Sequence, residues 1–448
     1  MTQKKKNSKN GKKESQPVYF MDLEVEGVKC FKDKQVLDLS DGNGKPARWT
    51  VILGDNGTGK TTLLKILSLM EAEIDFVYES DTDDRMVYVP KGGYSRLTSS
   101  LLNSSFKVMG VKKLFLGNLK DKKPSIEGYW ITIVGELMYG PSNVVDDLSK
   151  LKVYGYGASR KPGKGAISET FTEKISESLF KGDIQLINAE EWLLQMIFAA
   201  QNANSKFRAK LESKYVKVKE ILKQILPDIS DFRIKPITEN QTKAIIQAKT
   251  FYGWIDMKEL SLGYQTIIAW MVDLAARLFD RYPESENPLA EPAVVLVDEI
   301  DLHLHPKWQR NLISHLTNVF PQTQFIVTAH SPLIVQSAED ANIVLLKREG
   351  DRVKIYNNKD EDVIKGWRVD QVLTSDLFGL ESTRPPKYDE ALKRKEELLN
   401  KKRLTKKDKE ELENIGKKLD ELNISIGEKH NDALEALQKA AAVLKSNR

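Results

Sequence analysis

The sequence predicts an α/β fold in which helices cover a parallel sheet. Short apolar runs of strand length alternate with segments whose apolar residues recur at helical spacing. This alternation is typical of parallel strands that are joined by helices. In addition, the apolar run Trp49–Leu53 is followed by a glycine-rich loop and then by helical spacing over Thr62–Ala72. A strand that passes through glycines into a helix is a common unit of such folds.

The other elements support the same fold class. Apolar residues alternate in the segment before the glycine-rich loop, beginning at Tyr19, which favours strands. Later apolar patterns predict further strands and helices. The predicted strands are Met86–Val89, Trp130–Met138, Ala293–Val297 and Gln324–Thr328, and the predicted helices are Glu190–Gln201, Phe207–Leu226 and Lys307–Val319, with one more opening at Leu262–Gln265.

The pattern after Pro386 is helical. Two apolar stripes at helical spacing predict two helices. Thr405 and Asp408 have the spacing of a capping box between two helices. The stripes are Leu412, Ile415, Leu419 and Leu422, and then Leu434, Leu437, Ala441 and Leu444.

Composition limits the classes of protein to consider. Of the 448 residues, 40% are hydrophobic and 30% are charged, as in ordinary globular proteins. The only cysteine, Cys30, cannot form an internal disulfide. The longest uninterrupted apolar run lies around Ala293–Val297 and is far shorter than the ~18–20 residues of a membrane span. We therefore expect a cytoplasmic protein without a membrane function.

The positive charge is concentrated near the N-terminus. The net charge is +5, and residues 1–13 contain six lysines and no acid. We expect residues 1–16 to be a disordered basic arm. Such an arm can bind DNA phosphates without sequence preference, although many basic runs are simply solvated tails. DNA contact through this arm, or through a dimer surface, is therefore one alternative.

The segment Gly54–Thr61 matches the pattern G-x-x-x-x-G-K-T, which cradles nucleotide phosphates. Its glycines let successive backbone N–H groups face phosphate oxygens at a helix N-terminus. We expect Lys60 to contact the β- and γ-phosphates of ATP and Thr61 to bind Mg²⁺. The residues predicted to bind the nucleotide here are Asn56, Gly57, Gly59, Lys60, Thr61 and Thr62.

An acidic pair follows the predicted strand Ala293–Val297. Asp298 is expected at the Mg²⁺ ion, and Glu299 is expected beside the attacking water, where it can act as the general base. A hydrophobic run before two acids is a weak signal alone. Because it follows a complete phosphate-binding loop, it predicts ATP hydrolysis.

Two further segments resemble motifs of ABC ATPases. Leu260–Gln265 resembles the LSGGQ signature, with Leu262 and Tyr264 at the two positions that differ. The resemblance implies that Ser261 and Gly263 contact the γ-phosphate held by a second protomer. His330, after the predicted strand Gln324–Thr328, resembles the switch histidine, which implies a catalytic contact with the γ-phosphate.

The order of these motifs resembles the RecF/SMC/OLD branch of ABC ATPases. Asp298–Pro306 has the sequence DEIDLHLHP, and within it Asp301 matches the D-loop that crosses the dimer interface in that family. The resemblance implies an ABC-ATPase head that binds ATP and Mg²⁺ between two protomers. It also explains His303 and His305 as neighbours of the D-loop rather than as metal ligands.

Two segments resemble the ATPase subunits of Septu anti-phage defence systems. They are Tyr154–Arg160 (YGYGASR) and Val372–Leu380 (VLTSDLFGL). This resemblance implies a defence ATPase that works with an HNH nuclease. The alternatives are a RecF-like ATPase of DNA repair or maintenance and a scaffold that binds ATP with little turnover. The long separation of Thr61 from Ser261 argues against a transporter subunit.

These motifs suggest how the chain is organised. Asp360–Asp362 has the D-x-D shape of a Toprim nuclease, but the helical segment after it lacks the βαβ body, so we expect no nuclease activity in this chain. The expected parts are the basic arm (1–16), an ATPase lobe with the phosphate loop (17–75), a mixed insertion lobe (76–255), an ATPase lobe with the other motifs (256–383) and a helical tail for oligomer or partner docking (384–448).

Overall fold

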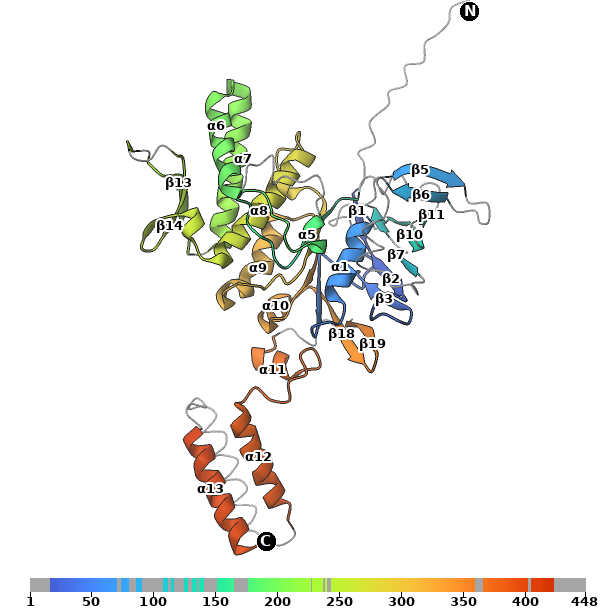
Figure 1. Ribbon diagram of the computed structural model, residues 1–448, viewed down its shortest axis with the longest axis vertical. Coiled ribbons are helices and arrows are strands. Elements are labelled where there is room, and N and C mark those ends of the chain that lie inside the picture. The colour runs from blue at the N-terminus through green and yellow to red at the C-terminus, as the bar shows by residue number, and fades with distance from the viewer. Residues whose placement is uncertain are drawn as a thin grey trace, which may run out of the picture. The chain divides into compact units, whose positions relative to one another are not determined.

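The computed structural model describes residues 17–70 and 151–422, except 165–175, 227, 237, 240–242, 359–365 and 402–403, and the backbone of the strands between residues 74 and 140. The contacts divide the chain into a larger unit, Met1–Val372, and a smaller unit, Leu373–Arg448. The larger unit carries all the motifs predicted to bind nucleotide (Figure 1). The five-part division proposed from the sequence stays a prediction.

A six-stranded sheet is the centre of the larger unit. Its strand order is β12-β16-β17-β4-β18-β19, and the first five strands are parallel, whereas β19 is antiparallel to β18. The predicted α/β fold with a parallel sheet is therefore confirmed. The strands are β12 (Val153–Tyr156), β16 (Ala293–Val297), β17 (Thr323–Thr328), β4 (Trp49–Gly54), β18 (Asn342–Glu349) and β19 (Arg352–Asn358).

The inner strands are apolar because both of their faces are covered. All residues of β16 and β17 are buried, as is typical of parallel strands with helices on either side. Trp49 of β4 stacks on Phe325 of β17 with ring centroids 4.2 Å apart. Strand β12 comes from the segment 76–255, so part of the predicted insertion lobe belongs to the central sheet.

Helices cover this sheet and lead away from it (Figure 1). Helix α1 contacts β4, β12, β16 and β17. In α8 every residue from Thr266 to Phe279 is buried, because apolar residues surround most of this helix. The helices are α1 (Lys60–Leu69), α5 (Glu177–Phe180), α6 (Ala189–Asn202), α7 (Ser205–Ile225), α8 (Leu262–Arg281), α9 (Pro306–Val319), α10 (Pro332–Ser337) and α11 (Val369–Thr374).

Three further sheets belong to the described part of the larger unit. One has the order β3-β2-β7-β10-β11-β6-β5, another β1-β8-β9 and the third β13-β14-β15. The predicted single strand Trp130–Met138 is wrong: it is divided between the antiparallel strands β10 and β11. The bounds are β1 (Val18–Phe20), β2 (Asp22–Glu26), β3 (Gln35–Asp38), β5 (Ile74–Glu79), β6 (Met86–Pro90), β7 (Val108–Val111), β8 (Leu114–Leu116), β9 (Ser125–Glu127), β10 (Ile131–Val134), β11 (Leu137–Gly140), β13 (Asp231–Ile234), β14 (Ile246–Thr250) and β15 (Gly253–Asp256).

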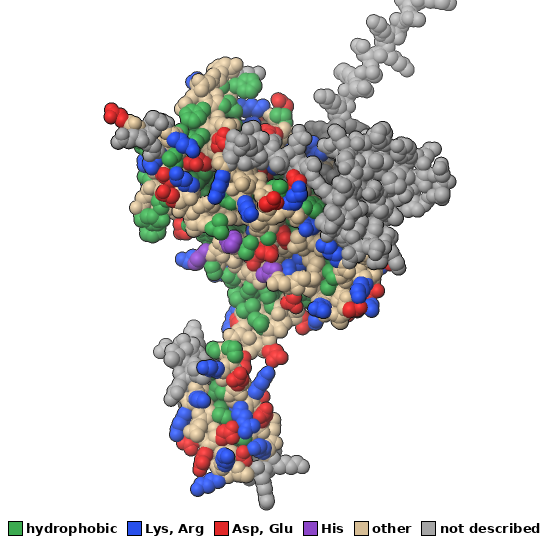
Figure 2. All heavy atoms as spheres, in the orientation of Figure 1, with side chains coloured by type: hydrophobic (Ala, Val, Ile, Leu, Met, Phe, Trp, Pro, Cys, Tyr) green, Lys and Arg blue, Asp and Glu red, His purple; other side chains and the backbone are tan. Residues whose placement is uncertain are grey.

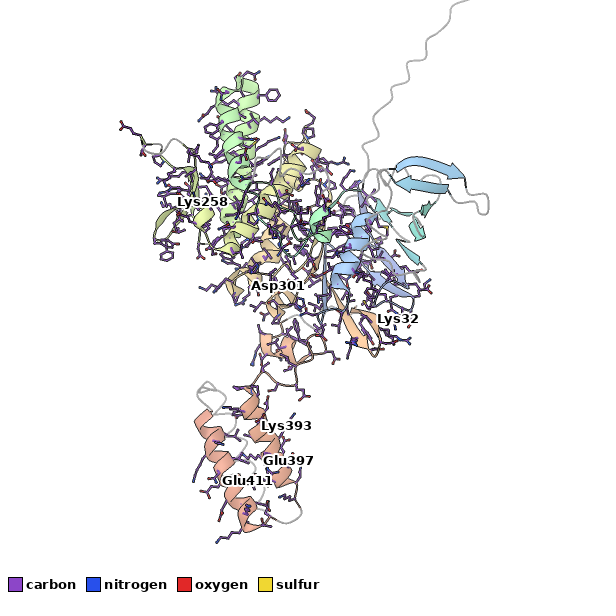
Figure 3. The ribbon with its side chains drawn as sticks, in the orientation of Figure 1. Lys32, Lys258, Asp301, Lys393, Glu397 and Glu411 are labelled. Atoms are coloured by element: carbon purple, nitrogen blue, oxygen red, sulfur yellow. The ribbon has the colours of Figure 1, made fainter. Side chains whose placement is uncertain are left out.

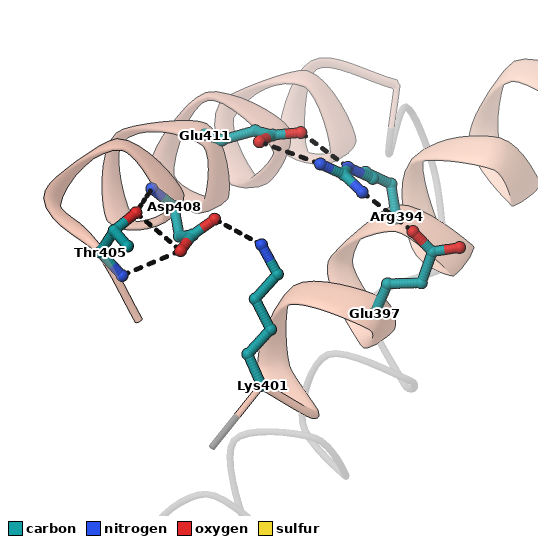
Figure 4. A network of polar contacts seen from close by, with 6 residues as sticks. All are labelled: Arg394, Glu397, Lys401, Thr405, Asp408 and Glu411. Atoms are coloured by element: carbon teal, nitrogen blue, oxygen red, sulfur yellow. Dashed lines mark hydrogen bonds and ion pairs between the residues drawn. The ribbon is translucent and has the colours of Figure 1, made fainter. Parts of the chain in front are cut away.

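The described residues of the smaller unit include the helical pair α12 (Pro386–Leu399) and α13 (Lys406–Leu422). Leu398, Ile415 and Leu419 are buried between them. Charged contacts also join the two helices: Arg394 pairs with Glu411, and Lys401 pairs with Asp408 (Figure 4). Arg394 pairs in addition with Glu397 of its own helix.

The predicted capping box at the start of α13 is confirmed. The N–H of Asp408 donates to Thr405 Oγ1 at 3.2 Å, and the N–H of Thr405 donates to Asp408 Oδ2 at 2.8 Å (Figure 4). The hydrogen bond from Lys401, together with those from Thr405, holds the pKa of the Asp408 carboxyl well below its usual range. The second predicted stripe, from Leu434 to Leu444, and the arm 1–16 lie outside the described residues. None of the described helices is long and apolar enough to span a membrane.

Candidate nucleotide-binding site

The predicted site residues lie at one edge of the central sheet. The phosphate loop follows β4, the acidic pair follows β16 and His330 follows β17. Because these strands are parallel, their carboxyl ends meet at the same edge. The segment that follows β12, including Arg160, reaches the same edge, since Tyr156 pairs with Val297.

Glycines give the phosphate loop its shape. Gly54, Gly57 and Gly59 all have positive φ, and Gly59 (φ 93°) caps the N-terminus of α1. A Cβ at Gly59 would lie 2.7 Å from both Cys30 Sγ and Phe31. Gly59 is therefore required both by its backbone conformation and by its close packing.

Lys60 is buried at the start of α1, and its ammonium bends back over the loop. Its Nζ donates to the carbonyl oxygens of Gly54 at 2.6 Å and Asp55 at 3.0 Å. Burial lowers the pKa of Lys60, while the nearby carboxylates, Asp298 first among them, act against that shift. The ammonium is therefore next to both the loop and the acidic pair.

Thr61 and Asp298 join the phosphate loop to the acidic pair. Thr61 Oγ1 donates to Asp298 Oδ2 at 2.8 Å, and Thr328 Oγ1 donates to Asp298 Oδ1 at 2.7 Å. Hydroxyl and carboxylate oxygens suit Mg²⁺, which usually takes one or two carboxylates together with substrate phosphates. The pair therefore fits Mg²⁺. Within the described residues, no cluster of three or more His, Cys, Asp or Glu could hold a metal alone.

Glu299 has a left-handed backbone conformation, with φ of 49°. This conformation is uncommon for a residue with a side chain and is often found at functional sites. The N–H of Glu299 donates to Thr328 Oγ1 at 2.7 Å, and its carbonyl accepts a hydrogen bond from Arg160 Nη2 at 2.8 Å. Several contacts therefore determine its backbone.

Asp301 and His330 are neighbours within one chain. The N–H of His330 donates to Asp301 Oδ2 at 3.1 Å, and Gln309 Nε2 donates to the Asp301 carbonyl at 3.2 Å. Figure 3 labels Asp301 in the middle of the larger unit. His330 is exposed, so the structure places the predicted switch residue at the surface of the sheet edge.

The segment resembling the ABC signature begins helix α8. Ser261 is the N-cap residue, is exposed, and makes no capping hydrogen bond with its side chain. Gly263 is buried, and a Cβ there would lie 2.4 Å from the carbonyl oxygen of His303. The signature segment therefore packs against the segment of Asp301, while Ser261 faces solvent.

The two histidines of the H-x-H segment, His303 and His305, lie between the acidic pair and helix α9. His305 Nδ1 accepts a hydrogen bond from the N–H of Lys307 at 3.3 Å, so this histidine caps α9. His303 has φ of 63° and contributes its carbonyl to the contact with Gly263. The segment Asp360–Asp362 lies outside the described residues.

Sequence reasoning did not assign two residues that hold the acidic pair. Thr328 contacts both Asp298 and Glu299, as described above. Arg160 is 2% exposed and donates to the carbonyl oxygens of both acids. Burial lowers the pKa of Arg160 to about 10, which leaves the guanidinium charged at neutral pH. In the sequence, Arg160 stands out only as the last residue of the segment Tyr154–Arg160, which resembles Septu ATPase subunits, and that resemblance implies no role for it.

The chain is similar in part to known proteins. A family model described as "AAA domain, putative AbiEii toxin, Type IV TA system" matches residues 164–336. The matched segment contains the signature, the acidic pair and His330, whereas the phosphate loop precedes it. Among solved structures, the SmcHead bound to the C-winged helix domain of ScpA aligns over 76% of this chain and 97% of that chain, with 17% identity and a TM-score of 0.45.

The relatives by sequence include Septu and retron proteins. Septu protein PtuA of Bacillus mycoides (strain KBAB4) is 27% identical over 403 residues, which are 89% of this chain and 50% of that protein. The Retron Ec83 probable ATPase of Escherichia coli is 48% identical over 93 residues, which are 21% of this chain and 17% of that protein. The chain thus spans half or less of the length of these relatives. It is related to Septu PtuA over most of its own length, as its motifs predicted.

Proposed function

We propose that this chain is the ATP-binding and ATP-hydrolysing subunit of an anti-phage defence assembly and that its nucleotide state controls an associated HNH-type nuclease. The observation that carries the nucleotide part is the 2.8 Å hydrogen bond from Thr61 Oγ1 to Asp298 Oδ2, because it joins the phosphate loop to the acidic pair. The names of the PtuA and retron relatives support the defence setting. The nuclease follows from the resemblance to Septu ATPase subunits.

Each residue of the site has a distinct task in this proposal. Lys60 binds the β- and γ-phosphates, and Thr61 and Asp298 hold Mg²⁺. Bound Mg²⁺ would stabilise the negative charge that develops on the transferred phosphoryl group. Glu299 accepts the proton of the attacking water, and His330 contacts the γ-phosphate from the neighbouring strand.

The proposed active form contains two copies of the chain. Ser261 is an exposed N-cap with an unused side-chain oxygen, and a helix N-terminus attracts phosphate. We propose that Ser261 and Gly263 of one copy complete the site formed by Lys60 and Glu299 of the other. The aspartate of the D-loop, Asp301, lies between the two sites in this arrangement.

Mixing two inactive variants tests the shared site. Lys60→Ala and Ser261→Arg should each hydrolyse ATP poorly alone. Their mixture should regain up to about a quarter of wild-type turnover, since half of the randomly mixed two-fold dimers contain one intact site of two. Steady-state ATP hydrolysis after mixing measures this.

The matched control mixes Lys60→Ala with Glu299→Gln. These residues belong to the same half of the site, because Thr61 and Asp298 are hydrogen-bonded within one chain. This mixture should therefore stay inactive. Recovery in the control mixture, or none in the first mixture, would exclude the shared site.

The nuclease partner and the DNA-repair alternative are separated by co-purification. Glu299→Gln purified from its native host with ATP and Mg²⁺ should bring down a nuclease in constant ratio, because the bound nucleotide is not consumed. Recovery of DNA with repair proteins, and no nuclease, would favour a RecF-like function. On the face shown in Figure 2, basic and acidic side chains of the described residues are interspersed, so that surface shows no basic patch of the kind that attracts DNA.

A further inference from the structure

The segment Tyr154–Arg160 connects the central sheet to the acidic pair. The carbonyl of Tyr156, the last residue of β12, accepts a hydrogen bond from the N–H of Asp298 at 2.8 Å. The hydroxyl of Tyr156 donates to buried Asp273 at 2.9 Å. This strand end is therefore fixed on both sides, and four residues later the chain reaches Arg160.

Arg160 lies beneath the acidic pair and contacts its backbone. The Nη1 atom of Arg160 donates to the carbonyl of Asp298, and Nη2 donates to the carbonyl of Glu299 at 2.8 Å. The side chain is nearly fully buried. Its Nε is a buried atom with no hydrogen-bond partner among the described residues, so the whole polar contribution of the guanidinium goes to these two carbonyls.

These contacts fix both peptide groups next to Glu299. The peptide before it is held by Arg160 at the Asp298 carbonyl and by Thr328 at the Glu299 N–H. The peptide after it is held by Arg160 at the Glu299 carbonyl and, through the N–H of Ile300, by the carbonyl of Thr328 at 2.9 Å. The orientation of these two planes sets φ and ψ of Glu299 and thereby the direction in which its Cα–Cβ bond leaves the backbone.

An arginine suits this task better than other side chains. Its planar fork presents two N–H groups at a fixed separation, whereas the lysine ammonium is a point charge on a flexible stem. Glu299 also needs such support because a left-handed conformation persists only where the surroundings hold it.

We propose that Arg160 is a positioning residue that fixes the left-handed backbone of Glu299 and so aims its carboxylate at the attacking water. The catalytic part of this proposal, the aiming of the Glu299 carboxylate at the attacking water, rests on the proposed ATP hydrolysis. Its structural part, the restraint of the Glu299 backbone, does not require any activity.

Arg160→Lys tests both parts. The ATP affinity of the variant should stay within about 3-fold of wild type, because Arg160 contacts backbone carbonyls and not the nucleotide. Its kcat should fall at least about 10-fold, because the general base loses its position. Hydrogen exchange without nucleotide should become faster in peptides covering residues 296–302 and stay unchanged in peptides from α8. Equal kcat with unchanged exchange would overturn the proposal.

Arg48→Lys is the matched control. Arg48 of the larger unit also donates to two backbone carbonyls, those of Thr317 and Phe320, but it precedes β4 and so lies at the opposite end of that strand from the phosphate loop. It should show a comparable loss of thermal stability with kcat close to wild type. If both variants lower kcat equally, Arg160 is only a structural residue.

Wild-type protein provides a test that no folding defect can obscure. The amides of Glu299 and Ile300 should exchange slowly, like those of the buried strand β16, although they lie in a turn. Rapid exchange at these amides would contradict the proposed restraint. If wild type hydrolyses no ATP but these amides are slow, the proposed function fails and the positioning of Glu299 stands.

Discussion

Glu299→Gln is expected to lower the rate of ATP hydrolysis by about 10²–10⁴-fold, the usual contribution of a general base. Glutamine has nearly the same shape as glutamate, but its amide cannot accept the proton of the attacking water. The residues assigned to phosphate and Mg²⁺ binding, Lys60, Thr61 and Asp298, remain in place. ATP affinity should therefore change little, and the long-lived bound ATP should increase the population of dimer or higher assembly. Single-turnover hydrolysis and light scattering with ATP and Mg²⁺ measure the two effects.

Glu291→Gln is a suitable control for this experiment. Glu291 precedes β16, and its carboxylate accepts a hydrogen bond from Ser285 Oγ, away from the sheet edge that forms the site. This variant should keep wild-type turnover. Normal hydrolysis by Glu299→Gln would remove Glu299 as the base, and a failure to increase assembly would contradict the two-copy model.

The sequence predicted three adjacent strands of the central sheet, β16, β17 and β4, because their signals are local. The run Ala293–Val297 is buried on both faces and has the expected bounds, and the pattern of Gly54–Thr61 requires a strand before it and a helix after it. Strand β12 was missed because four residues, two of them aromatic and one a glycine, give no distinct pattern. Its place beside β16 depends on pairing between distant segments, which one sequence does not reveal.

The predicted site residues likewise have local sequence signals, whereas the missed ones depend on contacts between distant segments. Lys60, Thr61 and Asp298 belong to motifs in which residue type and spacing already imply the chemistry. Arg160 donates to the backbone carbonyls of the acidic pair. Thr328 donates to the carboxylate of Asp298 and accepts a hydrogen bond from the backbone amide of Glu299. Such contacts arise only when the strand ends meet. A surface arginine and this buried one look alike in the sequence.

Lys60→Ala is expected to weaken ATP binding by on the order of 10²-fold, because removing one partner of a buried, hydrogen-bonded charge pair costs roughly 2–5 kcal/mol. Lys60 is the buried cation closest to the loop carbonyls of Gly54 and Asp55. Burial lowers the pKa of Lys60, and the nearby carboxylates, those of Asp298 and Glu299 first among them, act against that shift. Its removal leaves those acids with less positive charge nearby, so an incoming triphosphate meets net repulsion.

Lys65→Ala separates this local effect from a general loss of charge. Lys65 is on the same helix, α1, and its Nζ lies 5.6 Å from the centre of the Phe180 ring, so it points to α5 rather than to the phosphate loop. Both variants lose one lysine from one helix, but only Lys60→Ala should lose affinity in a calorimetric titration with ATP and Mg²⁺. Equal, small losses would mean that long-range charge alone attracts the nucleotide. The large difference expected here requires an ammonium that contacts the phosphates directly, because charges that are further apart are screened by salt.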